Sequence, residues 1–197
     1  RDSAQRELML KGGIELASVG VGDAEDDPAR GDTDIAREQD LRSAYAQARW
    51  SRPVGASGRL KLQYYANYDR WIDDTLYGPD NGFSFAGLAN PRVRVDLNVR
   101  SVRHDIEAVY TTEASDDLRL VAGAGARHEA VESRWLFGTD EPQTNDLLRL
   151  FGHAEYRAGP RTTLHLGALV EDNDIVGTTT SPRLALVQRT APHQRLR

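Results

Sequence analysis

Apolar and polar residues alternate along most of this chain. Between residues 118 and 130 all but one of the even positions carry leucine or alanine, while Arg119, Arg127 and Glu129 occupy odd positions. Neighbouring residues of a β-strand lie on opposite faces, so this segment predicts a strand with one apolar and one charged face. Helical periodicity is scarce. The same alternation recurs in three further segments, at residues 8–16, 148–156 and 164–170.

This alternation predicts about eight long strands, whose connections differ in length. The strands are expected at 5–20, 40–52, 58–71, 96–112, 118–133, 146–158, 162–174 and 181–190, with a ninth beginning near 194. Short, turn-forming connections fall at 53–57, 113–117, 159–161 and 191–192, and longer linkers at 21–39, 72–95, 134–145 and 175–180. Such alternation is typical of outer-membrane barrels, so the expected fold is all-β: an antiparallel up-and-down transmembrane β-barrel segment with short periplasmic turns and long extracellular loops.

Strand length and aromatic placement agree with that fold. Several predicted strands exceed the about 9 to 11 residues that a tilted strand needs to cross the hydrocarbon core. Strands of soluble sandwiches are shorter, at about 5 to 6 residues. Aromatic residues near strand ends could form the belts found at membrane interfaces, or be ordinary strand aromatics. They are Trp50, Trp71, Tyr77, Trp135 and Phe137.

Composition narrows the classes of function. The 197 residues are 39% hydrophobic and 28% charged, which suits a globular protein or a barrel with a wet interior. No apolar run approaches the about 20 residues of a spanning helix. Basic residues number 25 among 30 acidic ones and form no stripe, so nucleic acid is not an expected partner. Cysteine is absent, which removes disulfides and thiolate metal sites.

The last third of the chain carries the most specific pattern. Residues 136–158 and 171–187 resemble the barrel of TonB-dependent outer-membrane receptors. Ser181-Pro182-Arg183-Leu184-Ala185-Leu186, followed by Pro192 and Leu196-Arg197, resembles a mid-barrel hairpin of that family. The resemblance is clear over 96–197, whereas 1–95 matches only in strand rhythm and loop placement.

This resemblance implies a location, a function and a set of partners. Residues 1–197 would be a partial receptor barrel domain of the cell outer membrane, without a recognisable plug domain and truncated at both ends. The function implied is TonB-dependent uptake of a scarce nutrient such as an iron–siderophore complex or cobalamin. The implied partners are outer-membrane lipid, the plug domain of the same full-length chain, TonB through that plug, and a small nutrient ligand. A small structural or adhesive outer-membrane barrel, or a soluble β-barrel binding protein, are the alternatives.

Two groups of residues are candidates for the site. Exposed loops commonly carry recognition, so Tyr77, Phe83 and Phe85 of the 72–95 linker are candidates for the ligand entrance. Charged residues of the polar face are candidates for lining a lumen or bonding to a plug, although each could simply hydrate the barrel interior. These lumen-facing candidates are Arg119, Arg127, Arg149, Glu155, Arg157 and Arg183.

No catalytic, cofactor or metal site is expected. The sequence offers no local nucleophile–base pair and no carboxylate pair at a set spacing, so the protein is not expected to be an enzyme. Gly123-Ala124-Gly125 lies inside an alternating strand and not before a helix, so it is not a phosphate loop. Its glycines are expected to leave room for the plug or a neighbouring segment. Five histidines lack zinc-site spacing and are expected in the lumen or at the rim: His104, His128, His153, His165 and His193.

Two acidic runs have two interpretations. Asp23–Asp27 and Glu171–Asp174 could supply oxygen ligands to calcium. Neither has the spacing of an EF-hand loop, and clustered like charges usually stay hydrated. Solvated loops are therefore the preferred interpretation.

Overall fold

The computed structural model describes residues 6–22, 36–77, 92–191 and 194–196. Nearly all of these residues are in strands, with a single helical turn. The elements are β1 (Glu7–Val21), β2 (Arg37–Val54), β3 (Gly58–Ile72), β4 (Asp74–Tyr77), β5 (Val93–Asp96), β6 (Val99–Ser115), β7 (Leu118–Glu132), α1 (Arg134–Phe137), β8 (Gln143–Gly159), β9 (Thr162–Asn173), β10 (Gly177–Ala191) and β11 (Gln194–Leu196).

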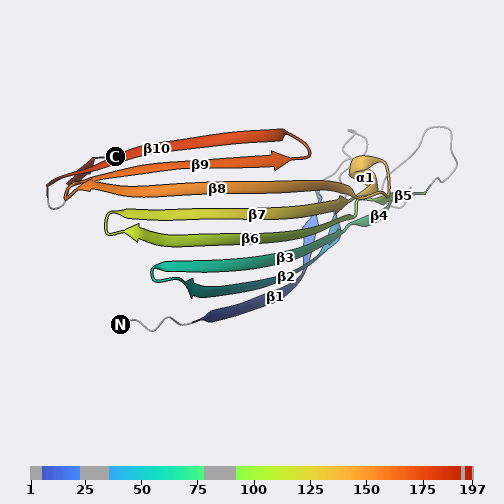
Figure 1. The fold of residues 1–197 in the computed structure, drawn as a ribbon. Coiled ribbons are helices and arrows are strands. Elements are labelled where there is room, and N and C mark those ends of the chain that lie inside the picture. Colours follow the sequence, from blue (N-terminus) through green and yellow to red (C-terminus); the bar gives the residue numbers. More distant parts are fainter. Residues whose placement is uncertain (1–5, 23–35, 78–91, 192–193, 197) are drawn as a thin grey trace.

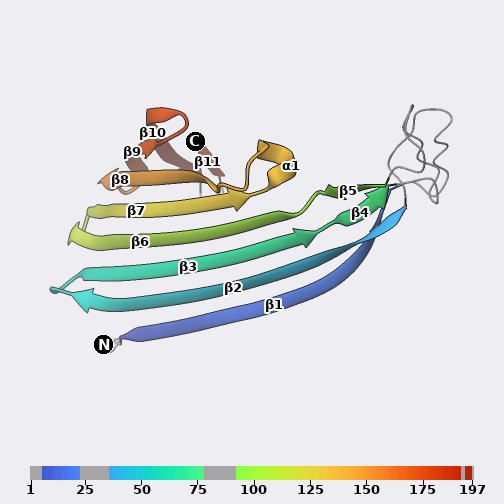
Figure 2. The same ribbon diagram turned by 90° about the vertical axis from the view of Figure 1, so that its right-hand side faces the viewer.

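One antiparallel sheet contains all the long strands. Its order is β1-β2-β3-β6-β7-β8-β9-β10-β11, and β4 pairs with β5 in a separate two-stranded ribbon (Figure 1). Each strand therefore pairs with the next long strand of the chain, which is up-and-down topology. The sheet is curved, and β9 to β11 face a different direction from β1 to β7 (Figure 2). The predicted fold class is confirmed.

Each predicted long strand corresponds to an observed one, but three linkers differ from the prediction. The 72–95 linker contains β4 and the first part of β5. The 134–145 linker contains α1, where Ser133 accepts a hydrogen bond from the Leu136 amide as N-cap and Gly138 ends the helix with φ 69°. Local capping explains this turn, which has too few residues to leave a helical period.

The third difference concerns the linker at 175–180, where β9 and β10 are joined by a tight turn. The Asn173 side chain accepts hydrogen bonds from the Ile175 and Val176 amides at 2.9 and 3.2 Å, and Gly177 has φ 75°. Threonine favours extended backbone, so β10 already begins at Gly177 and runs through the threonines at 178–180. The expected strict alternation of long and short connections fails at this point.

Pro182 consequently lies within β10 and not at the strand entrance that the sequence pattern suggested. It pairs with Ala168 of β9. Within the described residues, β11 pairs with β10 from Gln188 onward.

Candidate functional site

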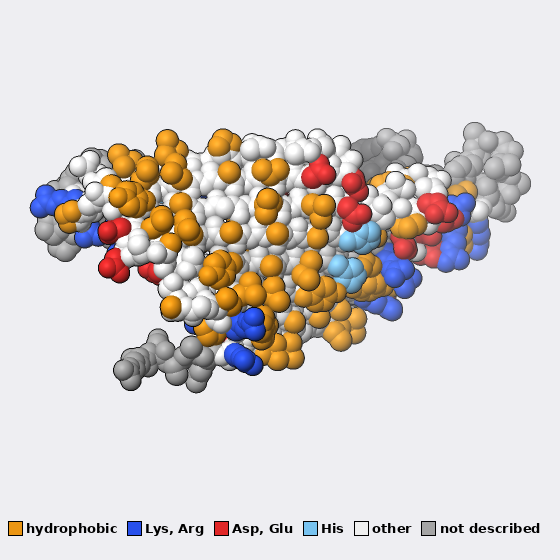
Figure 3. All heavy atoms as spheres, viewed as in Figure 1, with side chains coloured by type: hydrophobic (Ala, Val, Ile, Leu, Met, Phe, Trp, Pro, Cys, Tyr) orange, Lys and Arg blue, Asp and Glu red, His pale blue; other side chains and the backbone are white. Residues whose placement is uncertain are grey.

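One face of the sheet, called here the apolar face, presents a continuous surface of hydrophobic side chains. Residues that lie directly opposite one another on seven neighbouring strands form one row of this face: Leu8, Trp50, Leu62, Ala108, Ala124, Leu150 and Val170. Large members of this face are open to the surroundings, with Ile14, Leu150 and Leu184 exposed by 81%, 63% and 72%. Figure 3 shows hydrophobic side chains spread over the middle of this face. Exposed apolar area on this scale marks a surface that meets lipid or a protein partner.

Polar pairs mark the end of the apolar face where the strands lead into the longer connections. Tyr64 Oη lies 2.7 Å from His104 Nδ1, and His128 Nδ1 lies 2.7 Å from Asp146 Oδ1. Figure 3 shows histidine and acidic side chains beside the hydrophobic region at this end. Trp50 lies on the apolar face, as an interface belt requires, whereas Trp71 pairs with Leu41 and so lies on the opposite face. Trp71 is thus no part of a lipid-facing belt.

The opposite face, called here the charged face, has an ion-pair cluster at its centre. Asp105 of β6 accepts hydrogen bonds from Arg127 Nε of β7 at 2.9 Å and from Arg149 Nη2 of β8 at 2.8 Å. Arg149 also lies 3.3 Å from Glu107, which is 3.8 Å from Lys61 of β3. The side chains of Asp105 and Arg149 are only 15% and 18% exposed. Charged groups that are so little exposed to solvent are destabilising unless they are paired. The ion pairs of this cluster therefore connect four strands.

A glycine on β7 leaves the space that lets the Arg149 side chain cross from β8 to β6. Gly125 of β7 lies between Arg149 and Glu107 in the register. A Cβ added to Gly125 would be 2.7 Å from Arg149 Nε, so the arginine crosses β7 over the space that glycine leaves. Phe151 lies over Gly123 in the same way, at 2.2 Å from the added Cβ. The room predicted at Gly123 and Gly125 is therefore filled by side chains of the neighbouring strand.

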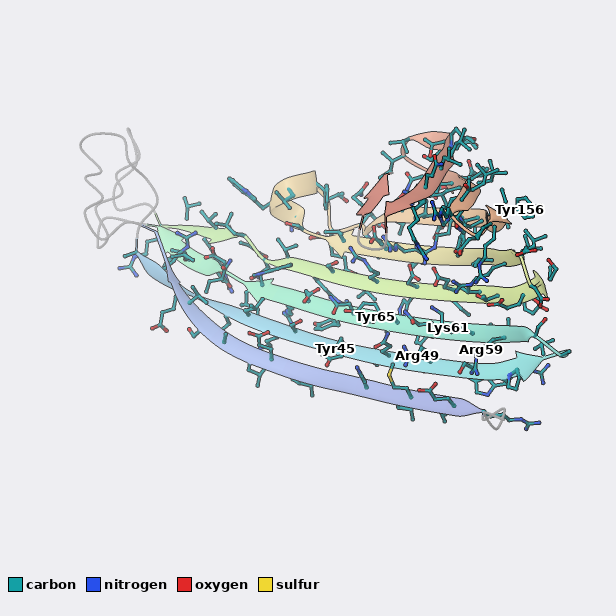
Figure 4. All side chains as sticks on the ribbon, turned by 90° about the vertical axis from the view of Figure 1, so that its left-hand side faces the viewer. Tyr45, Arg49, Arg59, Lys61, Tyr65 and Tyr156 are labelled. Carbon is teal, nitrogen blue, oxygen red and sulfur yellow. The ribbon has the colours of Figure 1, made fainter. Side chains whose placement is uncertain are left out.

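A second polar cluster lies on β2 and β3. The Tyr45 and Tyr65 rings stack with centroids 6.4 Å apart, and Ser43 donates a hydrogen bond to Asp69 at 2.6 Å. Asn67, between Tyr65 and Asp69 on the same face, donates to Asp69 and accepts from Tyr65. Figure 4 shows Tyr45 and Tyr65 on adjacent strands, with Arg49 and Lys61 nearer the short turns. Aromatic and hydrogen-bonding groups thus share this part of the charged face.

The six predicted lumen-facing residues all lie on the charged face. Arg127 and Arg149 meet at Asp105, and Arg119 is directly opposite Glu155 in the register. Arg157 donates to the Asp116 carbonyl at 3.4 Å, and Arg183 is opposite Gly167. Sequence reasoning missed Lys61, Asp105 and Glu107. Alternating charges at 103, 105 and 107 were the available signal, but their partners lie on other strands.

A buried carboxylate fixes the start of the longest connection. Asp73, at 3% exposure, receives a bidentate pair from Arg37 at 2.7 and 2.8 Å. Its backbone amide donates to the Asn98 side chain at 2.8 Å, and its carbonyl accepts from the Leu97 amide at 2.8 Å. Asp73 therefore joins the beginning of β2 to both ends of the β4–β5 segment.

Of the predicted ligand-entrance residues, Tyr77 is the last residue of β4, and Phe83 and Phe85 lie outside the described residues. Asp23–Asp27 also lies outside them. The ribbon itself carries an exposed ion pair, in which Arg94 Nε donates to Asp74 Oδ1 at 2.7 Å. This hydrogen bond, and next the attraction of the guanidinium, lower the pKa of Asp74 and raise that of Arg94.

The histidines are less scattered than the sequence suggested. His104 and His128 lie on the apolar face at its polar end, while His153 and His165 lie side by side on the charged face, with ring centroids 5.5 Å apart. His193 is outside the described residues. Adjacent strands bring together residues that are 12 positions apart in sequence, which no local motif reveals.

Solved structures of siderophore receptors share this fold. The chain superimposes on the ferric enterobactin receptor PfeA of Pseudomonas aeruginosa (G324V mutant) with a TM-score of 0.62 and 12% identity, covering 94% of this chain and 29% of that one. For the siderophore receptor PirA of Acinetobacter baumannii the TM-score is 0.61 and the identity 14%, covering 98% and 30%. The chain thus spans less than a third of each receptor. No family model and no curated protein matches the sequence.

The fold is therefore that of the barrel wall of siderophore receptors, and the resemblance seen in the sequence is confirmed at the level of fold. At 12–14% identity the likeness does not identify a ligand. In the described part of the chain, no helix has the length and apolar character needed to cross a membrane.

Proposed function

We propose that this chain forms part of the wall of an outer-membrane receptor barrel that takes up a scarce nutrient, such as an iron–siderophore complex or cobalamin, using energy transmitted by TonB. The observation that carries the proposal is that the sheet exposes its apolar side chains and shelters its charged ones. Leu150 and Leu184 are largely exposed, while Arg149 and Asp105 are largely sheltered. A protein surrounded by water places these residue types the other way round, whereas a barrel in lipid requires this arrangement.

Each face then has its own partner. The apolar face contacts outer-membrane lipid, and the charged face borders a watery bore that holds the plug domain of the same full-length chain. TonB acts through that plug. Arg119 and Arg183 are the best candidates for contacts with the plug, because neither belongs to the ion-pair cluster around Asp105. The proposed role is binding and transport, without a catalytic step.

The connections between β1 and β2 and between β4 and β5 form part of the ligand entrance in this proposal. Asp73 holds the β4–β5 segment to the sheet through Arg37 and Asn98. A recognition loop needs such an anchor, since ordering a free loop on binding would reduce affinity. Tyr77, Phe83 and Phe85 are the side chains proposed to meet the nutrient.

The test uses the full-length protein and two probes, a ferric catecholate siderophore and cobalamin. Residues 78–91 are deleted in one variant and residues 23–35 in another, and binding is measured by titration in detergent. We expect at least one deletion to weaken binding of one probe about tenfold or more, a change of about 1.4 kcal/mol. Heat-modifiable migration on gels should remain, because the sheet is untouched. Ser57→Ala, at a short turn on the other edge, is the control.

Unchanged binding and uptake of both probes in both deletion variants would refute the entrance role. A triple substitution of Tyr77, Phe83 and Phe85 by alanine separates side-chain recognition from loop length. We expect this variant to lose most of the affinity that the 78–91 deletion loses.

A further inference from the structure

Three residues with metal-ligating side chains come together on the charged face near the short turn between β8 and β9. They are His153 and Glu155 of β8 and His165 of β9, and one ligand atom from each lies within 4.8 Å of the others. Glu155 is directly opposite His165, and His153 lies two positions away on the same face. All three side chains are half-buried.

The two imidazole rings stack, with one nitrogen of each close to the other. His165 Nδ1 lies 3.4 Å from His153 Nε2, and the rings are inclined by 26°. Gly167 stands opposite His153 in the register, and a Cβ added there would approach His153 Nδ1 to 3.3 Å. Glycine therefore leaves the space in which the His153 ring leans across β9 towards His165.

The donor set decides which class of ion suits the cluster. Two imidazole nitrogens and one carboxylate are a common ligand set for zinc, with a fourth position left for water or another ligand. Calcium and magnesium prefer a set made up of oxygen atoms. Arg119 lies opposite Glu155, and Arg183 lies opposite Gly167. Their charges repel any divalent cation alike, so the choice of ion rests on the two nitrogen ligands.

We propose that His153, Glu155 and His165 form a binding site for a divalent transition metal ion of the zinc, cobalt or nickel class. The ion binds His153 Nε2, His165 Nδ1 and a Glu155 carboxylate oxygen, and its remaining coordination position opens onto the charged face. It joins β8 to β9 close to the short-turn edge. The site depends on no property of the transported nutrient, so it can be tested apart from uptake.

Without a metal, the same residues have a competing arrangement. Glu155 can turn to Arg119 on the adjacent strand β7, and the two histidines can share a single hydrogen bond. This alternative predicts no metal affinity above that of any exposed histidine. It also predicts that removing His128, on the apolar face, would matter as much as removing His165.

The experiment measures metal binding by the full-length protein purified in detergent, with no nutrient present. Co²⁺ reports coordination through its visible d–d absorption, and Zn²⁺ affinity is measured by competition with a chromophoric chelator. The wild type should bind one Co²⁺ with an intense band indicating fewer than six ligands, which Zn²⁺ displaces. His165→Ala and His153→Gln should each lower the Zn²⁺ affinity by at least about 10- to 100-fold, the range known for loss of a ligand's supporting contacts. Glu155→Gln should weaken it less.

His128→Ala is the matched control, because it removes one histidine and leaves the three ligands in place. It should keep the wild-type band and affinity. The proposal is wrong if the wild type gives no Co²⁺ band, or if His128→Ala lowers the affinity as much as His165→Ala does. Gel migration and circular dichroism establish that each variant is folded; if His165→Ala is not, His153→Gln decides the question.

Discussion

The two faces of the same strands differ in which side chains are exposed and which are sheltered. On the apolar face, Leu148, Leu150 and Leu166 are exposed and have no partner element among the described residues. On the charged face, Asp105, Arg127 and Arg149 are sheltered and bonded to one another across three strands. The difference teaches that the chain builds no apolar core in the described residues. Its hydrophobic side chains are exposed on one face, and polar groups of the other face bond to one another across strands.

Glycines let long side chains cross neighbouring strands on both faces. On the charged face, Gly123 and Gly125 are covered by Phe151 and Arg149, which lean across β7. On the apolar face, Tyr110 of β6 lies over Gly58 of β3. The crossing side chain on the charged face includes an arginine that reaches a carboxylate, whereas the one on the apolar face is a tyrosine.

The largest expected effect comes from placing a charge on each face in turn. Leu150→Arg, on the apolar face, should destabilise the membrane-inserted protein by about 2 to 4 kcal/mol, the cost of an arginine in the middle of the lipid. Leu169→Arg, at a neighbouring depth on the charged face, is the matched control. It should cost less than half as much, as judged by urea unfolding in liposomes. Equal losses would remove the distinction between the faces.

The next effect concerns the ion-pair cluster. Asp105→Asn keeps the size of the side chain but withdraws the charge that Arg127 and Arg149 share. We expect a loss of about 1 to 3 kcal/mol in the same unfolding assay, because both arginines lose the carboxylate they share and Arg149 keeps only Glu107 as a charged partner. Asp140→Asn removes an exposed pair with Arg134 and should change stability by less than about 1 kcal/mol. If Asp105→Asn were equally mild, the cluster would not hold the strands together.

A smaller effect is expected at Gly125. Gly125→Ala adds a Cβ 2.7 Å from Arg149 Nε and 3.0 Å from the Ile106 carbonyl oxygen. Arg149 must then withdraw from Asp105, so we expect a loss of about 1 kcal/mol. At Gly20 an added Cβ meets nothing within 4 Å, and alanine there should be neutral or slightly stabilising. A stable Gly125→Ala variant with Arg149 still on Asp105 would disprove the crossing argument.

The smallest effect is on the pH dependence of stability in the β4–β5 ribbon, which belongs to neither the apolar face nor the charged face. Arg94 lowers the pKa of Asp74, so their pairing contributes stability above the ordinary carboxyl range, near about 4, and loses it as pH falls through the lowered value. Site-specific NMR titration of Asp74 should give a midpoint below that range, and Arg94→Ala should restore it. A midpoint that Arg94→Ala does not move would contradict the pairing.

The fold could largely be predicted from the sequence because period-two alternation is a local property of each strand. Segments such as 118–130 contain the information for both faces. Features governed by capping or by distant partners could not be predicted in that way. The α1 turn depends on Ser133 and Gly138, and β10 begins at Gly177 because Asn173 closes the preceding turn.

The candidate site was less predictable for the same reason. Arg127 and Arg149 were identified as polar-face residues, but their common partner Asp105 emerges only from the register of β6, β7 and β8. His153 and His165 likewise lie 12 positions apart in sequence and meet only across β8 and β9. The role of the six charged residues in a bore remains a prediction.

The most direct test of which face meets lipid uses the absence of cysteine from the chain. Single cysteines introduced at Leu150 and at Leu169 can carry nitroxide labels in liposomes. Electron paramagnetic resonance then compares their collisions with oxygen, which concentrates in lipid, and with a water-soluble nickel chelate. We predict that the label at 150 collides mainly with oxygen and the label at 169 mainly with the chelate. Chelate-accessible labels at 150 together with oxygen-dominated labels at 169 would contradict the account.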